Sequence, residues 1–327
     1  MRGEEKGQPL CIAPKKKTPK KRMRAFGRAK PIEWGSESFV FPAAIKLKYK
    51  PDDAKREYEM QRMCASAYVV PVEYLEIARA IVMPAATMDL FAFLDSKERI
   101  EPAELWRIVR QMSAAVAAVH RKSVVHRDVK LENFLCFDEP CGDFDDWDDE
   151  AEETDETGEK EEEKEEKENE ALGAHEALGP RTISSTRMVV RLTDFGYATK
   201  LEEGRKLSAR AGTRVGSVEY IAPEIAAFEQ YDAKADVWSF GVCVFMMLTK
   251  CAPFERFERF ERFAFECYEH YGNFEKCAQK QWNKRSKELT GAQRAVVTRS
   301  LTVDQDRRAS SADISRTAMR AARALEA

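Results

Sequence analysis

The segment His126-Arg-Asp-Val-Lys-Leu-Glu-Asn133 is the most informative part of this sequence of 327 residues. Asp128 and Asn133 offer carboxylate and amide oxygens, which are hard ligands of the kind that Mg²⁺ prefers. An apolar run follows this polar loop directly, and the triplets Asp194-Phe-Gly196 and Ala222-Pro-Glu224 stand further along the chain. Any one of these strings could arise by chance, whereas all three in this order indicate one functional site.

Together these strings resemble the catalytic loop, the metal-binding triplet and the end of the activation segment of the protein kinase family. The resemblance covers residues 25–135 and 187–320, most of the chain. It implies a phosphotransferase that uses ATP and Mg²⁺ to modify serine or threonine hydroxyls of protein substrates. Lys130 is typical of the serine/threonine branch, and the activation segment is most similar to the calcium/calmodulin-kinase and AMP-kinase-like group.

The resemblance also assigns roles to the charged residues. Phosphoryl transfer requires a protein mainly to position the reactants and to neutralise phosphate charge. By resemblance, Asp128 orients the attacking hydroxyl and Lys130 lies near the transferred phosphate. Asn133 and Asp194 are the expected Mg²⁺ ligands.

Upstream, Ala44-Ile-Lys46 resembles the strand whose lysine grips the α- and β-phosphates, and Ala44 would face adenine. Two glutamates compete as the helix partner of Lys46. Glu59 has Met63 one turn further along the same helix face, and we take it as the expected partner. Glu57 fits the register of the following strand better, so both remain open.

The hinge of the nucleotide pocket is read by resemblance from Ile81-Val-Met-Pro-Ala85. Val82 is expected at the gatekeeper position, beside the back of the pocket. Met83 and Ala85 would offer backbone groups to adenine. Leu135, after the catalytic loop, completes the expected nucleotide-binding residues.

The glycine-rich phosphate loop is where the resemblance is weakest. Gly27-Arg-Ala-Lys-Pro-Ile32 occupies its place, but only the first of three expected glycines is present. Glycines let the backbone approach phosphates closely, and Ala29 and Ile32 impair that approach. The alternative hypothesis is therefore a catalytically impaired pseudokinase that acts as a scaffold or binding module.

Three further matches concern regulation and stability. Thr213 stands where relatives carry an activating phosphosite, and Arg127 could pair with that phosphate. Asp236 resembles the buried aspartate that anchors the catalytic loop. Arg308 is expected to form a buried ion pair with Glu224.

Strand-like and helix-like patterns are segregated along the chain. Their order predicts an α+β protein kinase fold of two lobes, with a small β-rich N-lobe and a larger helical C-lobe. The expected strands are 38–41, 43–49, 68–74, 78–83 and 188–192, and the expected helices are 52–63, 89–95, 101–122 and most of the chain after 224.

The formal charge of −3 hides a strong asymmetry. Residues 138–170 hold 20 acidic side chains against 3 lysines, whereas residues 1–30 hold 11 basic and 2 acidic ones. Such segments cannot bury enough apolar surface to fold alone. The expected organisation is a disordered basic tail at 1–24, a kinase domain at 25–320 interrupted by a disordered acidic insert at about 138–186, and a C-terminal tail at 321–327.

Partners and location follow from charge. The basic clusters Lys15–Lys17 and Lys20–Arg22 favour nuclear import, so a cytoplasmic or nuclear protein is expected. The acidic insert suits basic partners, and Glu132 matches a position that binds basic residues of substrates. The 8 cysteines form no CxxC pair, which predicts free thiols in a reducing compartment. No apolar stretch is long enough to span a bilayer, and a nucleic-acid-binding function ranks last for lack of groove-reading motifs.

Overall fold

The computed structural model describes residues 43–48, 50–140, 186–209, 216–253 and 279–325. It comprises two compact units: one is formed by the chain up to Phe137 and from Val190 onward, the other by Asp138–Val189. The predicted basic tail, the strand at 38–41, Gly27, Thr213 and most of the acidic insert lie outside the described residues. Among the described helices, none is long and apolar enough to cross a membrane.

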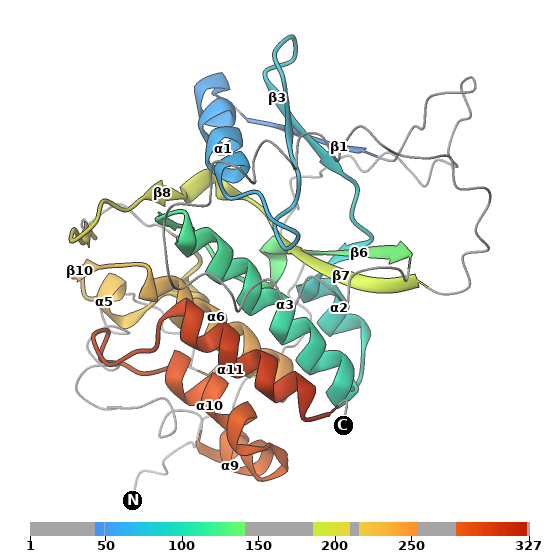
Figure 1. The fold of residues 1–327 in the computed structure, drawn as a ribbon, viewed down its shortest axis with the longest axis vertical. Coiled ribbons are helices and arrows are strands. Elements are labelled where there is room, and N and C mark those ends of the chain that lie inside the picture. Colours follow the sequence, from blue (N-terminus) through green and yellow to red (C-terminus); the bar gives the residue numbers. More distant parts are fainter. Residues whose placement is uncertain (1–42, 49, 141–185, 210–215, 254–278, 326–327) are drawn as a thin grey trace, which may run out of the picture. The chain divides into compact units, whose positions relative to one another are not determined.

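Within the described residues, three strands and one helix make the β-rich part of the first unit (Figure 1). Strands β1 (Ala43–Leu47), β3 (Ala80–Pro84) and β2 (Glu73–Leu75) form an antiparallel sheet in the order β1-β3-β2, and helix α1 (Pro51–Met63) packs against β3. The register places Ala44 opposite Met83 and Lys46 opposite Ile81. Because directly opposed residues share a face, these four side chains lie on one side of the sheet.

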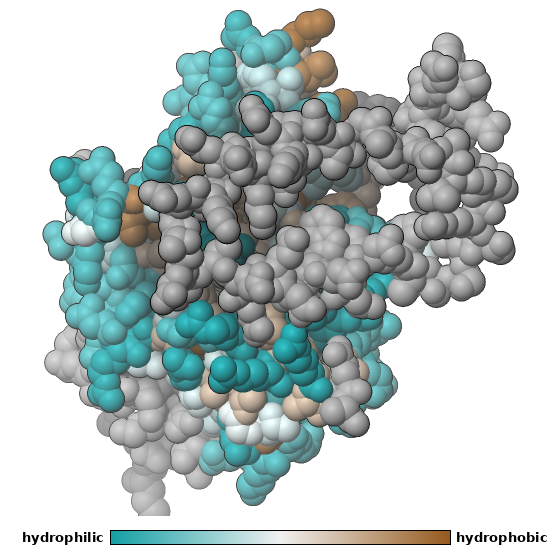
Figure 2. All heavy atoms as spheres, viewed as in Figure 1, coloured by the Kyte–Doolittle hydropathy of each residue, from teal (hydrophilic) through white to brown (hydrophobic). Residues whose placement is uncertain are grey.

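The opposite face of this sheet carries mainly apolar side chains, several of which are exposed. Ile45, Leu47 and Leu75 are 54%, 71% and 42% exposed, and Ile77, in the β2–β3 turn, is 98% exposed. Figure 2 shows apolar atoms at the upper edge of this view. The buried side of the sheet is therefore the one that carries Lys46.

Helix α1 begins with Pro51, a residue that suits the first helical turn, and Asp52 and Asp53 follow it where acidic side chains favour the helix dipole. Its buried positions recur every three or four residues, as one face of an amphipathic helix requires. They are Ala54, Glu57 and Gln61, and the face continues to the capping residue Cys64.

Helices dominate the other described residues of the first unit. They are α2 (Leu90–Ser96), α3 (Pro102–Arg121), α5 (Pro223–Ala226), α6 (Lys234–Thr249), α9 (Gln279–Arg285), α10 (Gly291–Ser300) and α11 (Ser311–Arg323). Helix α11 lies along α3, and α10 packs on α6 and α11 (Figure 1). A Cβ on Gly241 of α6 would lie 2.7 Å from the Cβ of Ser300 in α10, so this glycine is what lets the two helices approach so closely.

Short elements connect these parts and carry most of the polar loops. The strands pair in the orders β4-β6-β7, β5-β8 and β10-β9. The elements are β4 (Met88–Asp89), β5 (Val124–Val125), β6 (Phe134–Pro140), β7 (Thr186–Leu192), β8 (Thr199–Lys200), β9 (Leu207–Ser208), β10 (Gln230–Tyr231) and the 3-10 helices η1 (Leu131–Asn133), η3 (Phe195–Tyr197), η4 (Val218–Tyr220) and η5 (Ser286–Glu288).

These elements confirm the predicted α+β class, with details that differ. The strand expected at 68–74 is regular only from Glu73, because Pro71 has no backbone N–H to donate. Val69 forms an isolated parallel bridge with Leu192 instead. Helix α11 continues past the expected boundary at 320 to Arg323. Both ends of the predicted insert are strand, since β6 extends to Pro140 and β7 starts at Thr186.

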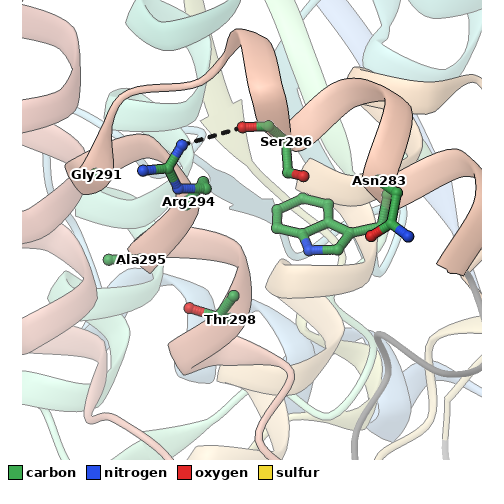
Figure 3. A pocket seen from close by; sticks show the side chains of 7 residues that line it. Asn283, Ser286, Gly291, Arg294, Ala295 and Thr298 are labelled. Atoms are coloured by element: carbon green, nitrogen blue, oxygen red, sulfur yellow. Dashed lines mark hydrogen bonds between the residues drawn. The ribbon is translucent and has the colours of Figure 1, made fainter.

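A hollow of about 520 Å³ lies between α9, η5 and α10 (Figure 3). The Arg294 guanidinium donates to the carbonyl oxygens of Ser286 at 3.2 Å and Leu289 at 2.7 Å. The Trp282 ring stacks on Phe245 with centroids 6.2 Å apart. The polar and aromatic side chains that line this hollow thus hold the helices together. Its lining residues are Trp282, Asn283, Ser286, Gly291, Arg294, Ala295 and Thr298.

Candidate functional site

Asp236, in the first turn of α6, anchors the loop 126–133 through hydrogen bonds to its backbone. The Asp236 carboxylate accepts the backbone N–H groups of His126 at 2.7 Å and Arg127 at 2.8 Å, and its Oδ2 lies 2.9 Å from His120 Nε2. Burial alone would raise the pKa of Asp236, but the hydrogen bond and charge of His120 hold that pKa below its usual value. The structure confirms the prediction that Asp236 anchors this loop.

Within the loop, Asp128, Lys130 and Asn133 converge. The Asn133 amide nitrogen donates to the backbone oxygen of Asp128 at 2.7 Å and to its Oδ2 at 3.1 Å. Lys130 Nζ lies 2.7 Å from the same Oδ2. Asp128 and Asn133 are each 6% exposed. Because the amide nitrogen is engaged, the amide oxygen of Asn133 is the atom oriented for a cation.

Ser217 joins this group, although sequence reasoning did not single it out. Its hydroxyl donates to Asp128 Oδ1 at 3.2 Å and accepts from Lys130 Nζ at 2.9 Å. The preceding Gly216 has φ +91°, and a Cβ there would lie 2.7 Å from the carbonyl oxygen of Arg127. The sequence signal that could have pointed to Ser217 was its position directly after Gly216, in a string that resembles the activation segment.

A second charged cluster connects β1, α1 and the triplet at 194–196. Lys46 Nζ lies 2.6 Å from Glu57 Oε1 and 2.8 Å from Asp194 Oδ1. Burial alone would lower the pKa of Lys46, but the charges of Asp194 and Glu57 raise it. Burial alone would raise the pKa of Asp194, yet the charge and hydrogen bond of Lys46 hold it at about 2. Both partners are therefore charged near neutral pH.

The prediction that Glu59 is the partner of Lys46 is wrong, because the structure pairs Lys46 with Glu57. The reason is the phase of α1. Glu57 lies on the buried face and is 1% exposed, whereas Glu59 is exposed and Met63 is 39% exposed. The face that contains Glu59 and Met63 points to solvent, not toward the sheet.

Lys48 is another residue that sequence reasoning missed. Its Nζ lies 2.6 Å from Glu57 Oε2, an ion pair without the geometry of a hydrogen bond. A Cβ on Gly196 would lie 2.9 Å from the same Nζ. The signal was present in the sequence, since Lys48 follows Lys46 at the two-residue spacing that keeps side chains on one face of an extended chain.

The predicted adenine-facing residues surround one apolar cluster. Ala44 and Leu135 pack against buried Met83 and its neighbours, and Ala85 is exposed. Thr193 Oγ1 lies 4.0 Å from Met83 Sδ, beside Asp194. The prediction that Val82 is the gatekeeper is wrong, because its side chain lies on the outer face opposite Ile45, and Met83 occupies the inner position.

The loop 126–133 and the triplet 194–196 contact each other through two aromatic rings. The His126 ring meets Phe195 edge-on at 4.8 Å, and its Nε2 lies 3.1 Å from the carbonyl oxygen of Thr193. Burial lowers the pKa of His126, so the ring is neutral near pH 7. Asp194 has φ +67°, a left-handed conformation uncommon for a non-glycine residue. Such strain is typical of functional sites.

The remaining predicted residues have defined places. Arg308 donates to both oxygens of Glu224 at 2.7 and 2.9 Å, which confirms the expected buried pair. Arg127 Nε donates to the carbonyl oxygen of Tyr197 at 2.6 Å. Its predicted partner, the phosphorylated side chain of residue 213, lies outside the described residues. Glu132 Oε2 accepts from the Tyr220 hydroxyl at 3.3 Å.

The donor set suits Mg²⁺ rather than a metal held wholly by protein. In the described part of the chain, no group of three or more His, Cys, Asp or Glu side chains could hold a metal ion. Mg²⁺ is commonly bound through one or two carboxylates together with waters and substrate phosphates. An ionised Asp194 and the Asn133 amide oxygen fit that pattern.

Comparison with known proteins gives consistent results. A model of the protein kinase domain matches residues 42–146 and 179–319. Serine/threonine-protein kinase unc-51 of Caenorhabditis elegans is 31% identical over 166 residues, which are 51% of this chain and 14% of that protein. Calcium-dependent protein kinase 4 of Plasmodium falciparum is 26% identical over 214 residues, 64% of this chain and 31% of that protein. Serine/threonine-protein kinase ULK1 of Homo sapiens is 26% identical over 198 residues, 61% and 14% respectively. The matched region spans less than a third of each of these relatives.

Proposed function

The chain belongs to the protein kinase family, and from that premise we propose that it is a serine/threonine kinase that transfers the γ-phosphate of ATP to protein hydroxyls. One observation carries the proposal. Lys46, Glu57 and Asp194 form a continuous charged contact beside the catalytic loop, with Lys46 protonated and Asp194 ionised. An ammonium group beside an ionised carboxylate is the arrangement that binding of phosphate together with Mg²⁺ requires.

In the proposed reaction, the side chains mainly position and neutralise. Lys46 would contact the α- and β-phosphates, while Asp194 and the Asn133 oxygen would hold Mg²⁺. The ion would neutralise charge on the β- and γ-phosphate oxygens. Asp128 would orient the substrate hydroxyl, and Lys130, 2.7 Å from that carboxylate, would neutralise charge on the transferred group.

The adenine ring would lie between Ala44 and Leu135, which pack against the same apolar cluster. The inner side chain of Met83 would limit the depth of the pocket. Ala85, which follows strand β3 and is exposed, is where backbone groups would be accessible to the base. Competition by adenosine for ATP binding would test this placement.

The alternative, a pseudokinase scaffold, is motivated by the single glycine, Gly27, in the expected phosphate loop. The two hypotheses are separated by a transfer assay with labelled ATP, Mg²⁺ and a generic basic substrate. We expect incorporation by the wild-type protein and none by Asp194→Ala. Absence of incorporation from both proteins would support the pseudokinase, and equal incorporation from both would indicate a contaminating kinase.

Substrates are proposed to carry basic residues near the target. The support is Glu132, an exposed carboxylate three residues before Leu135 and next to Leu131 of the catalytic loop, positioned by the Tyr220 hydroxyl. A positional peptide library should show enrichment of Arg or Lys that Glu132→Gln reduces. A flat profile in the wild-type protein would reject the preference.

A further inference from the structure

Lys48 brings a second ammonium group to the buried carboxylate of Glu57. Lys46 and Lys48 are two residues apart in an extended segment, so their side chains leave the same face. The Lys46 ammonium lies 2.6 Å from one oxygen of Glu57, and the Lys48 ammonium lies 2.6 Å from the other. A single carboxylate that is 1% exposed thus contacts two cations.

The Lys48 ammonium also lies against the triplet. A Cβ on Gly196 would be 2.9 Å from Lys48 Nζ and 3.3 Å from Glu57 Oε2. The glycine therefore leaves the space that this ammonium occupies. Helix α1 packs against η3 at the same place, so Lys48 lies where strand, helix and triplet meet.

Lys46 divides its single ammonium among several oxygens in the proposed reaction. Its ammonium is already 2.8 Å from Asp194, and the same group would contact nucleotide phosphates. An ammonium has only three N–H donors to distribute among these oxygens. Because a buried carboxylate is strongly destabilised without enough positive charge beside it, the Lys48 ammonium adds to the neutralisation of Glu57 while Lys46 also contacts Asp194 and phosphate.

We propose that Lys48 is a positioning residue, which holds Glu57 and helix α1 against the Asp194–Gly196 triplet whether or not Lys46 contacts nucleotide. This role rests on the proposed kinase function and deepens it. It acts through Glu57, since the position of α1 sets the position of the Lys46 ammonium.

The test compares Lys48→Met with Lys48→Arg, and uses Lys55→Met, which removes an exposed lysine of helix α1, as the control. Two quantities are measured: kcat/KM for ATP, and amide hydrogen exchange of α1 relative to α3. Lys48→Met should lower kcat/KM about tenfold, the lower end for a contact between charged groups, because the Lys48 side chain is 27% exposed. It should also speed exchange in α1 and leave α3 unchanged. Lys48→Arg should restore most of both, and Lys55→Met should change neither.

A double-mutant cycle with Glu57→Gln identifies the route of the effect. If Lys48 acts through Glu57, adding Lys48→Met to Glu57→Gln should change kcat/KM less than twofold. A further tenfold loss in that background would overturn the proposal, because Lys48 would then act on the nucleotide itself. Unchanged α1 exchange in Lys48→Met would overturn it as well. Hydrogen exchange needs no turnover, so a wild-type protein that transfers no phosphate would refute the proposed function while the exchange comparison still decided the role of Lys48.

Discussion

Replacing Glu57 by Gln should damage the proposed activity far more than the same replacement at Glu59. Glu57 is 1% exposed and lies 2.6 Å from the ammonium groups of both Lys46 and Lys48, whereas Glu59 is exposed. Removing one partner of a fully buried ion pair costs about 3–5 kcal/mol. The two lysines are 21% and 27% exposed and can partly hydrate, so the loss should be smaller, about 2–3 kcal/mol.

A loss of that size in transition-state stabilisation corresponds to roughly a 30- to 150-fold fall in kcat/KM. The assay is steady-state phosphate transfer at varied ATP concentration, with urea unfolding of each variant to confirm that the fold is retained. Glu59→Gln should stay within twofold of the wild-type protein. Equal losses in both variants, or a Glu57→Gln variant within twofold of wild type, would refute the assignment of Glu57 as the functional partner.

Three further predictions concern other parts of the site. Glu224→Gln should lower the free energy of unfolding by about 3–5 kcal/mol in urea titrations, because it leaves the Arg308 charge buried without its counter-charge; a change below 1 kcal/mol would contradict this. Gly216→Ala should lower kcat more than tenfold, because its Cβ would lie only 2.7 Å from the Arg127 carbonyl oxygen in the catalytic loop. The control is Gly204→Ala, where φ is +69° but no atom lies within 4 Å of the added Cβ. It should cost only about 1 kcal/mol of stability and leave kcat unchanged. The pKa of Asp194 in the folded protein is about 2, below its unfolded value. The ionised carboxylate therefore stabilises the fold above about pH 4, and that contribution is lost as the pH falls toward 2. The difference in unfolding free energy between the wild-type protein and Asp194→Asn should be constant from pH 5 to 8 and change below pH 4.

The candidate site residues that sequence reasoning proposed come mainly from short local strings. Asp128, Asn133 and Asp194 are each placed within a few residues of a recognisable neighbour, and the buried pair of Arg308 and Glu224 was also anticipated. Local strings carry this information because the backbone between their members is short. A role for each of these residues could therefore be proposed before any packing was known.

The wrong predictions concern residues whose role depends on which face of a helix or strand carries the side chain. Choosing Glu59 over Glu57 required knowing which face of α1 is buried, and a shift of two residues turns a helix by more than half a turn. Choosing Val82 over Met83 required the strand register, and a slip of one residue moves a side chain to the other face of a sheet. Ser217 was missed because its contact with Asp128 joins segments 89 residues apart.

The anchoring of the catalytic loop by Asp236 links the reactive groups to the most deeply packed helix. Both oxygens of that carboxylate hold loop amides, and the helix that carries it is buried almost all round. Moving the loop away from α6 would leave the buried Asp236 carboxylate without these two donors, which is costly, so we expect the loop and α6 to open together as one cooperative unit. Heating should therefore abolish turnover and melt the helical core over the same interval, without an earlier stage in which the protein remains folded but inert.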